Sequence, residues 1–211
     1  DFSSLDSEKW STVGEGYNKI DRTEVEEPSV ALSGYKCNEG QGGYLRTEQE
    51  IHLGAGKSLV VELYGNDWTE GMIFLQGLRS NDLELATFAD GVCITNQGMA
   101  TGDGKTSGAT ISTTWTGVAS GNFHIRSKMK FVLNADGTGR VDVLDLNNGA
   151  IEGAPGTAFT GLKYNQNGYW GLEGVNGLSL TLRKVVIGQQ DADGSNYAPL
   201  FVSNFVEGSR N

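Results

Sequence analysis

Two stretches of the sequence carry oxygen-bearing side chains of the types that calcium sites use. Residues 134–145, NADGTGRVDVLD, place such side chains at positions 1, 3, 5, 9 and 12, as a calcium loop between helices does. Residues 191–196, DADGSN, would supply Asp191, Asp193 and Asn196 as ligands. Calcium takes about six to eight oxygen ligands, which an irregular loop can provide. Both stretches also contain the Asp-Gly pair of an ordinary tight turn, which binds nothing.

The flanking residues favour a turn for the first stretch. KMKFVL before it and RVDVLDL after it alternate apolar and polar residues as strands do. Asp136 and Gly137 are the pair that a strand-to-strand turn requires, and Gly139 could accommodate a bulge. We therefore predict a β-hairpin at residues 134–145. The calcium hypothesis then rests on residues 191–196, where a turn is the alternative.

Aromatic side chains beside planar amides form a second group of candidates. Carbohydrate recognition needs flat aromatic surfaces for apolar sugar faces, and amides or carboxylates for the hydroxyls. Trp68 and Trp115 lie in polar, loop-like segments, and Tyr164, Asn165 and Gln166 are consecutive. We predict that these five residues contact a ligand. The alternative for the tryptophans is that they cap the ends of the fold.

A basic stripe is the third candidate. His124, Arg126, Lys128 and Lys130 occupy every second position of one predicted strand, so they share a face. The stripe is either a solvated sheet face or a contact surface for an acidic glycan or an acidic partner. In the second case His124 and Arg126 are ligand-binding residues.

The elements that must position these residues are short strands. In residues 57–65, alternation places Leu59, Val61 and Leu63 on one face. Similar runs recur along the chain, each bounded by Gly, Asn, Asp or Ser, and no convincing amphipathic helix exceeds about two turns. This pattern predicts an all-β fold, a two-sheet antiparallel β-sandwich.

Composition limits the possible partners. The 211-residue chain has 16 Lys and Arg against 26 Asp and Glu, a formal net charge of -10. This charge repels phosphate backbones and anionic membranes, so we expect no nucleic-acid partner, and a polyanionic ligand would need a local basic patch. The apolar runs are too short for membrane insertion.

Cys37 and Cys93 are either one disulfide or two free thiols. The start at Asp1, without a signal-like run, is typical of a mature or trimmed product.

Three segments resemble concanavalin A-like jelly rolls. The opening DFSSLDSEKW, with Phe2, Leu5, Asp6 and Trp10, is similar to the first strand of those domains. KMKFVLNADGTGRVDVLDLNNG resembles a hairpin from their second half, and GYWGLEGVNGLSLTLRKVVIG resembles their closing strand pair. The resemblance implies a jelly roll. The superfamily includes lectins, laminin-G-like binding modules, glycoside hydrolases and polysaccharide lyases, so it does not choose a function.

The catalytic motifs of that superfamily are absent or interrupted. The glucanase spacing E-x-D-x-x-E does not occur. Alginate-lyase-like members use R-[ST]-E-L-R, Q-[IV]-H and Tyr-Asn-Gln, in which Arg and Gln neutralise a uronate while His and Tyr move the proton. This chain has RTE at 46–48, QEIH at 49–52 and YNQ at 164–166, with Gln49 and Glu50 in place of Leu-Arg. We therefore assign no catalytic residue.

The sequence thus predicts a jelly-roll domain over residues 1–190. Residues 191–211 are an extension packed on the sandwich or a link to a following module. The predicted function is a secreted or surface-displayed, non-catalytic carbohydrate-binding module, lectin-like or the ligand-binding part of an adhesin. Its expected partners are a glycan or polysaccharide and other modules of a larger extracellular protein, and calcium is its candidate cofactor. The alternative is an enzyme acting on an extracellular polysaccharide, a lyase before a hydrolase.

Overall fold

Every element that the structure describes is a β-strand. The structure is a computed structural model that describes residues 7–13, 19–21, 29–32, 44–66, 71–78, 91–95, 98–102, 111–114, 127–150, 156–160, 164–175 and 180–204. In these segments there is no helix long and apolar enough to cross a bilayer.

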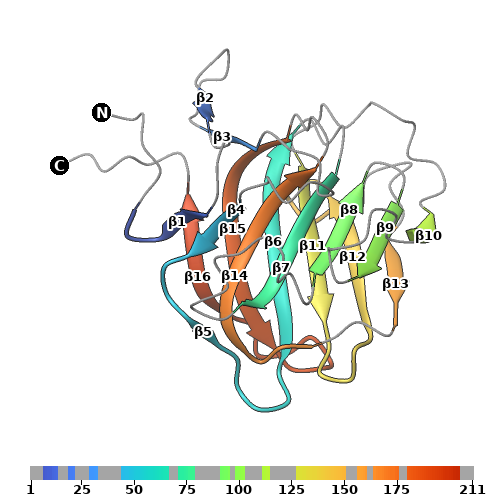
Figure 1. Cartoon of the computed structure of the whole chain (residues 1–211). Helices are drawn as coiled ribbons and strands as arrows, with labels where there is room; N and C mark the ends of the chain where they lie inside the picture. The colour runs from blue at the N-terminus through green and yellow to red at the C-terminus, as the bar shows by residue number, and fades with distance from the viewer. Residues whose placement is uncertain are drawn as a thin grey trace.

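The strands form two antiparallel sheets. In order across the first sheet they are β1 (Trp10–Val13), β4 (Tyr44–Thr47), β14 (Asn167–Val175), β7 (Gly71–Leu78), β8 (Gly91–Thr95), β9 (Gly98–Gly102) and β10 (Ile111–Thr114), with β5 (Ile51–His52) also paired to β14. Across the second sheet they are β13 (Thr157–Phe159), β12 (Gly139–Leu144), β11 (Ser127–Leu133), β6 (Ser58–Asn66), β15 (Leu180–Gln190), β3 (Ser29–Leu32) and β2 (Lys19–Asp21), with β16 (Ala198–Asn204) also paired to β15. Figure 1 shows β14, β7 and β8 lying in front of β6 and β11. The predicted all-β, two-sheet antiparallel sandwich is confirmed.

The core lies between the sheets and follows the alternation of the strands. In β6, Leu59, Val61 and Leu63 are at most 1% exposed, as the alternation predicts, while Ser58 and Val60 on the opposite face are also 0% exposed. Trp10 of the first sheet meets Phe201 of the second edge-on, with ring centroids 5.1 Å apart. The Trp10 indole nitrogen also donates to the Ser203 hydroxyl at 2.7 Å. Because both contacts join strands of different sheets, β16 contributes directly to holding the two layers together.

Three five-residue turns share one geometry. They span residues 134–138, 145–149 and 191–195. In each turn, the backbone amide of the first residue donates to the carbonyl of the fifth residue. The amide of the fourth residue donates to the carbonyl of the first. The fourth residue has a positive φ in all three, 84° at Gly137, 66° at Asn148 and 86° at Gly194. This is a tight turn followed by a bulge, so the hairpin predicted at residues 134–145 is confirmed.

The bulge in that hairpin is at Gly137, so its expected place at Gly139 is wrong. Gly139 begins β12 and pairs directly with Leu133 without a register shift. A Cβ atom there would collide with the Val132 carbonyl oxygen and the Phe159 ring. The glycine is therefore needed for close packing between strands rather than for a bulge.

Candidate functional site

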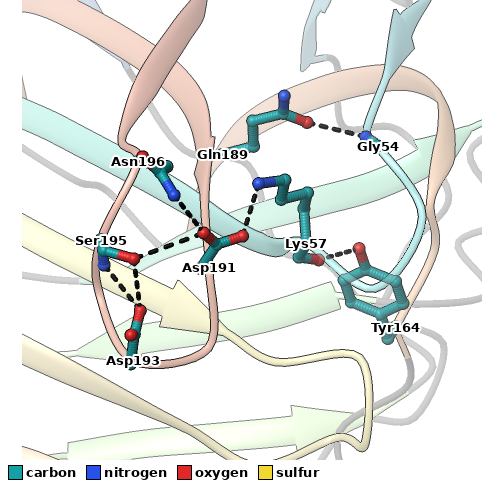
Figure 2. Close-up of polar contacts among 8 residues, drawn as sticks. All are labelled: Gly54, Lys57, Tyr164, Gln189, Asp191, Asp193, Ser195 and Asn196. Atoms are coloured by element: carbon teal, nitrogen blue, oxygen red, sulfur yellow. Dashed lines mark hydrogen bonds and ion pairs between the residues drawn. The ribbon is translucent and has the colours of Figure 1, made fainter.

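Polar side chains meet at one end of the sandwich, in what we call the end-loop cluster. The cluster comprises Gly54, Lys57, Tyr164, Gln189, Asp191, Asp193, Ser195 and Asn196 (Figure 2). The Lys57 ammonium forms an ion pair with the Asp191 carboxylate, and the Tyr164 hydroxyl donates to the Lys57 carbonyl. The Gly54 amide donates to Gln189 Oε1 at 2.7 Å. These bonds fasten the segment before β6 to the β15–β16 turn.

The carboxylates of the β15–β16 turn already face hydrogen-bond donors. Besides Lys57, Asp191 accepts bonds from Asn196 Nδ2 at 2.6 Å and from Ser195 Oγ at 3.3 Å. Asp193 accepts from the amide and hydroxyl of Ser195 at 2.9 and 2.6 Å. The bond from Lys57 is the largest cause that lowers the pKa of Asp191, and the bonds from Ser195 lower the pKa of Asp193.

This arrangement does not fit a calcium ion. Calcium needs a shell of oxygen ligands, whereas an ammonium and an amide nitrogen face the Asp191 carboxylate. Within the described segments, no group of three or more His, Cys, Asp and Glu side chains could hold a metal ion. Binding at Asp191, Asp193 and Asn196 stays a prediction, and it requires these donors to move away.

The consecutive residues Tyr164, Asn165 and Gln166 belong to the same end of the molecule. Gln166 Nε2 donates to the Leu53 carbonyl at 3.0 Å, and the Leu53 amide donates to the Gln166 carbonyl at 2.9 Å. Burial raises the pKa of Tyr164, whose hydroxyl is already engaged with Lys57. Tyr164 and Gln166 therefore hold neighbouring backbone in place, and their contact with a ligand stays a prediction, as it does for the half-buried Asn165.

The other predicted ligand-binding residues lie outside the described segments. They are Trp68, Trp115, His124 and Arg126. Cys37 also lies outside them, and the side chain of Cys93 in β8 is not described. Their roles stay predictions.

The outer face of the second sheet carries another polar cluster, which we call the tyrosine surface. It comprises Glu62, Tyr64, Lys128, Asn148, Lys184 and Tyr197. Lys128 and Glu62 form an ion pair at 3.0 Å, with side chains only 4% and 12% exposed. Lys128 also donates to Asn148 Oδ1. The ammonium groups of Lys128 and Lys184 lie 5.4 and 5.1 Å from the centre of the Tyr64 ring.

Tyr197 completes this surface from the chain segment before β16. Its side chain is 44% exposed, and its hydroxyl donates to Glu62 Oε2 at 3.3 Å. A Cβ atom on Gly188 would lie 3.0 Å from the Tyr197 ring, so the glycine leaves room for the ring over the sheet. Burial, and then the charge of Glu62, raise the pKa of Tyr197 to about 12. The phenol therefore stays neutral at physiological pH.

Strand register explains why these side chains meet. Lys128 of β11 and Lys184 of β15 both pair with Tyr64 of β6. Lys130 pairs in the same way with Glu62, so the described half of the predicted basic stripe lies on this face. Directly paired residues project to the same side of a sheet, which brings the lysines next to a carboxylate and a phenol.

Two residues of the lyase-like motifs, Arg46 and His52, lie on the outer face of the first sheet, whereas Tyr164 and Gln166 lie at the loop end described above. The Arg46 guanidinium lies 4.8 Å from the centre of the Tyr169 ring. His52 is exposed and lies 3.7 Å from the Glu50 carboxylate. Arg46 pairs with Gly171 and His52 with Asn167, four positions apart on β14. At about 3.4 Å per residue, their backbone positions lie about 14 Å apart along the strand.

No protein-family model and no curated protein sequence matches the chain. Among solved structures, the exoplasmic/lumenal domain of VIP36 in its Ca2+-bound form is similar over 90% of this chain and 88% of that domain, with a TM-score of 0.50 and 13% identity. The chain has the same two-sheet fold as that domain. At this identity the likeness shows the fold alone.

Two further structures are similar at lower TM-scores. A lectin from Bauhinia forficata in complex with GalNAc is similar over 89% of this chain and 93% of the lectin chain, with a TM-score of 0.46 and 12% identity. A protein of unknown function from Shewanella oneidensis MR-1 is similar over 96% of this chain and 78% of that protein, with a TM-score of 0.47 and 11% identity.

Sequence reasoning missed most of the tyrosine surface. Alternation places Glu62 and Tyr64 on the polar face of their strand, but no local signal shows which strands flank it. Tyr197 lies in the polar stretch SNYAP, which has no feature that marks a site. Only the pairing of β6 with β11 and β15 reveals the cluster.

Proposed function

We propose that this chain is a non-catalytic carbohydrate-binding module, secreted or displayed on a cell surface. The observation that carries the proposal is the tyrosine surface, where Tyr197 and Tyr64 flank the carboxylate of Glu62 on one sheet face. Tyrosine rings suit the apolar faces of sugars, and a carboxylate and ammonium groups suit their hydroxyls. The lectin among the structural neighbours is an additional support for this class of ligand.

Ordered side chains strengthen this proposal. Glu62 is fixed by Lys128 and Tyr197, and Tyr64 lies between two ammonium groups. Fixed side chains lose little conformational entropy when a ligand binds, so less of the interaction free energy is spent on ordering them. The ligand would pack against the exposed phenol ring of Tyr197 rather than enter a deep cavity, as is typical of a binding module.

A glycan array with the whole chain tests the proposal. Tyr197→Ala should lower the affinity for any bound glycan about fivefold or more, because truncating a central aromatic contact costs more than about 1 kcal/mol. Leu146→Ala is a matched control, since Leu146 is 47% exposed and Tyr197 is 44% exposed. A melting temperature for each variant shows that folding is preserved. No binding on a broad array, or binding that Tyr197→Ala leaves unchanged, would reject the proposed site.

Calcium is a separate matter that this binding does not depend on. Glycan binding through the tyrosine surface should be the same in calcium and in EDTA. A calcium ion bound at Asp191, Asp193 and Asn196 would instead raise the melting temperature by mass action. An unchanged melting temperature rejects calcium at this turn and leaves the carbohydrate proposal standing.

A polysaccharide lyase is the second candidate. The observation that favours it is that Arg46, Tyr169, Asn167 and His52 share the outer face of the first sheet. Such groups could neutralise a uronate and move a proton. The separation of Arg46 from His52 along β14 places this function second. A rise in ultraviolet absorbance from unsaturated products on alginate or polygalacturonate, abolished by His52→Ala, would replace the binding proposal with this one.

A further inference from the structure

The charges on the outer face of the second sheet differ in sign from those of the chain as a whole. The chain has a formal net charge of -10. Along β12, β11, β6 and β15 this face carries four cations and two carboxylates, a local excess of two positive charges. They are Lys128, Lys130, Arg140 and Lys184 against Glu62 and Asp142. A local excess of this kind is what a polyanionic ligand needs on an acidic protein.

Two of these cations are already paired. Lys128 is held by Glu62 at 3.0 Å, and Arg140 by Asp142 at 2.8 Å. Lys130 and Lys184 have no carboxylate within ion-pair distance among the residues that the structure describes. The Lys184 ammonium is nevertheless placed, since it lies 5.1 Å from the centre of the Tyr64 ring. The positive excess is therefore located on Lys184, beside the Tyr64 ring, and on Lys130, whose strand partner is Glu62.

From this charge pattern we propose that the tyrosine surface selects acidic polysaccharides, whose carboxylate or sulfate groups bind Lys184 and Lys130. The inference rests on the proposed function and adds the chemical class of the glycan. Tyr197 reaches Glu62, which lies two residues from Tyr64 on the same face of β6, so a glycan bound at Tyr197 can extend toward Lys184. There a neutral hydroxyl gains less than an anion does.

The spacing of the two lysines favours a polymer over a single sugar. Lys130 and Lys184 are separated by two strand spacings across the sheet and by two residues along it. At about 4.8 Å per strand and about 3.4 Å per residue, their backbone positions lie about 12 Å apart. Successive acidic units of a chain can place one anionic group at each lysine.

The test compares oligogalacturonate with its methyl ester by isothermal titration calorimetry of the whole chain, with heparin fragments as the sulfated probe. We expect an acidic probe to bind more tightly than the ester, and its affinity to fall as salt is added. Lys184→Gln should weaken the acidic probe about threefold to fivefold, equivalent to up to about 1 kcal/mol, and weaken any binding of the ester by a smaller factor. Lys130→Gln should act in the same direction. Lys9→Gln removes the same charge from a side chain that donates to the Val202 carbonyl of β16, outside the tyrosine surface, and it should change little.

The possible results distinguish a failure of the selection for acidic glycans from a failure of the proposed carbohydrate-binding function. Equal affinity for the ester, no effect of either lysine variant, or an equal effect of Lys9→Gln would overturn the selection for acidic glycans. So would binding of neutral glycans only, but if Tyr197→Ala then weakened that binding, the carbohydrate function would stand. A chain that binds none of these probes and nothing on the glycan array would overturn both.

Discussion

The buried ion pair between Lys128 and Glu62 allows a prediction whose size follows from its surroundings. In Glu62→Leu, the Lys128 ammonium, whose side chain is only 4% exposed, loses its carboxylate. Removing one partner of a buried pair costs about 3–5 kcal/mol. The side-chain amide oxygen of Asn148 and the Tyr64 ring at 5.4 Å still face the ammonium, so we expect a loss of about 2–3 kcal/mol in the free energy of unfolding.

The reverse and double variants complete a cycle. Lys128→Met leaves Glu62 with the Tyr197 hydroxyl as a donor and 12% exposed, so its loss should be smaller, about 1–2 kcal/mol. The double variant leaves no unpaired charge, and apolar replacement of a buried pair is often neutral. We expect it to lose less than about 1 kcal/mol, which gives a coupling energy of at least about 2 kcal/mol.

Urea unfolding at neutral pH, followed by tryptophan fluorescence, measures these free energies. Arg140→Met is the matched control on the same sheet face, because its ion pair with Asp142 has side chains 53% and 27% exposed. The control should lose less than about 1 kcal/mol. A double variant that loses the sum of the two single losses would show that the charges are not coupled and would refute the reasoning.

Three further predictions follow from single contacts. Gly139→Ala should destabilise the fold by about 2 kcal/mol or more in urea unfolding, because its Cβ collides with the backbone and with the ring of Phe159. The pKa of Tyr197 is raised to about 12, so its neutral phenol stabilises the fold below the ordinary tyrosine pKa, and this contribution is lost as the pH rises through about 12. In an ultraviolet titration of the tyrosines, Tyr197→Phe should remove one phenol from those that ionise at the highest pH. The lowered pKa of Asp191 contributes stability above the ordinary aspartate pKa, which is lost as the pH falls through the lowered value. Asp191→Asn should therefore make the melting temperature less sensitive to acid.

Different outcomes would contradict each of these. An alanine at position 139 that leaves the unfolding midpoint unchanged means that β12 and Phe159 do not pack as described. If Tyr197→Phe removes a phenol from the ordinary range, the ring is not held beside Glu62. A melting temperature with the same acid dependence after Asp191→Asn means that the ion pair with Lys57 does not form in solution.

Much of the fold could be predicted because its signals are local. The alternation of residues 57–65 marks the core face of β6, where Leu59, Val61 and Leu63 are buried, but it does not show that Ser58 and Val60 on the opposite face are buried too. The hairpin at residues 134–145 follows from the Asp-Gly pair between two alternating runs. Its bulge was misplaced by two residues, because two glycines compete there and only the hydrogen bonds decide which one takes the positive φ.

The candidate site could not be predicted in the same way. The stripe of lysines could be recognised, but not that Lys128 would be buried against Glu62 and Asn148. The residues Tyr164 and Gln166 have the composition of a sugar site, yet their polar groups bind neighbouring backbone. Residue types show what chemistry is possible, and their bonding partners show what chemistry is left for a ligand.

The sequence by itself determined the strands, the turns and the acidic charge, because each depends on residues that are neighbours in the chain. The tertiary structure decided which side chains meet. Glu62 lies 66 positions from Lys128 and 135 from Tyr197, and Lys57 lies 134 from Asp191. These contacts depend on the order and register of the strands. Strand order and register are set by the packing of all the apolar faces together, which no local pattern specifies.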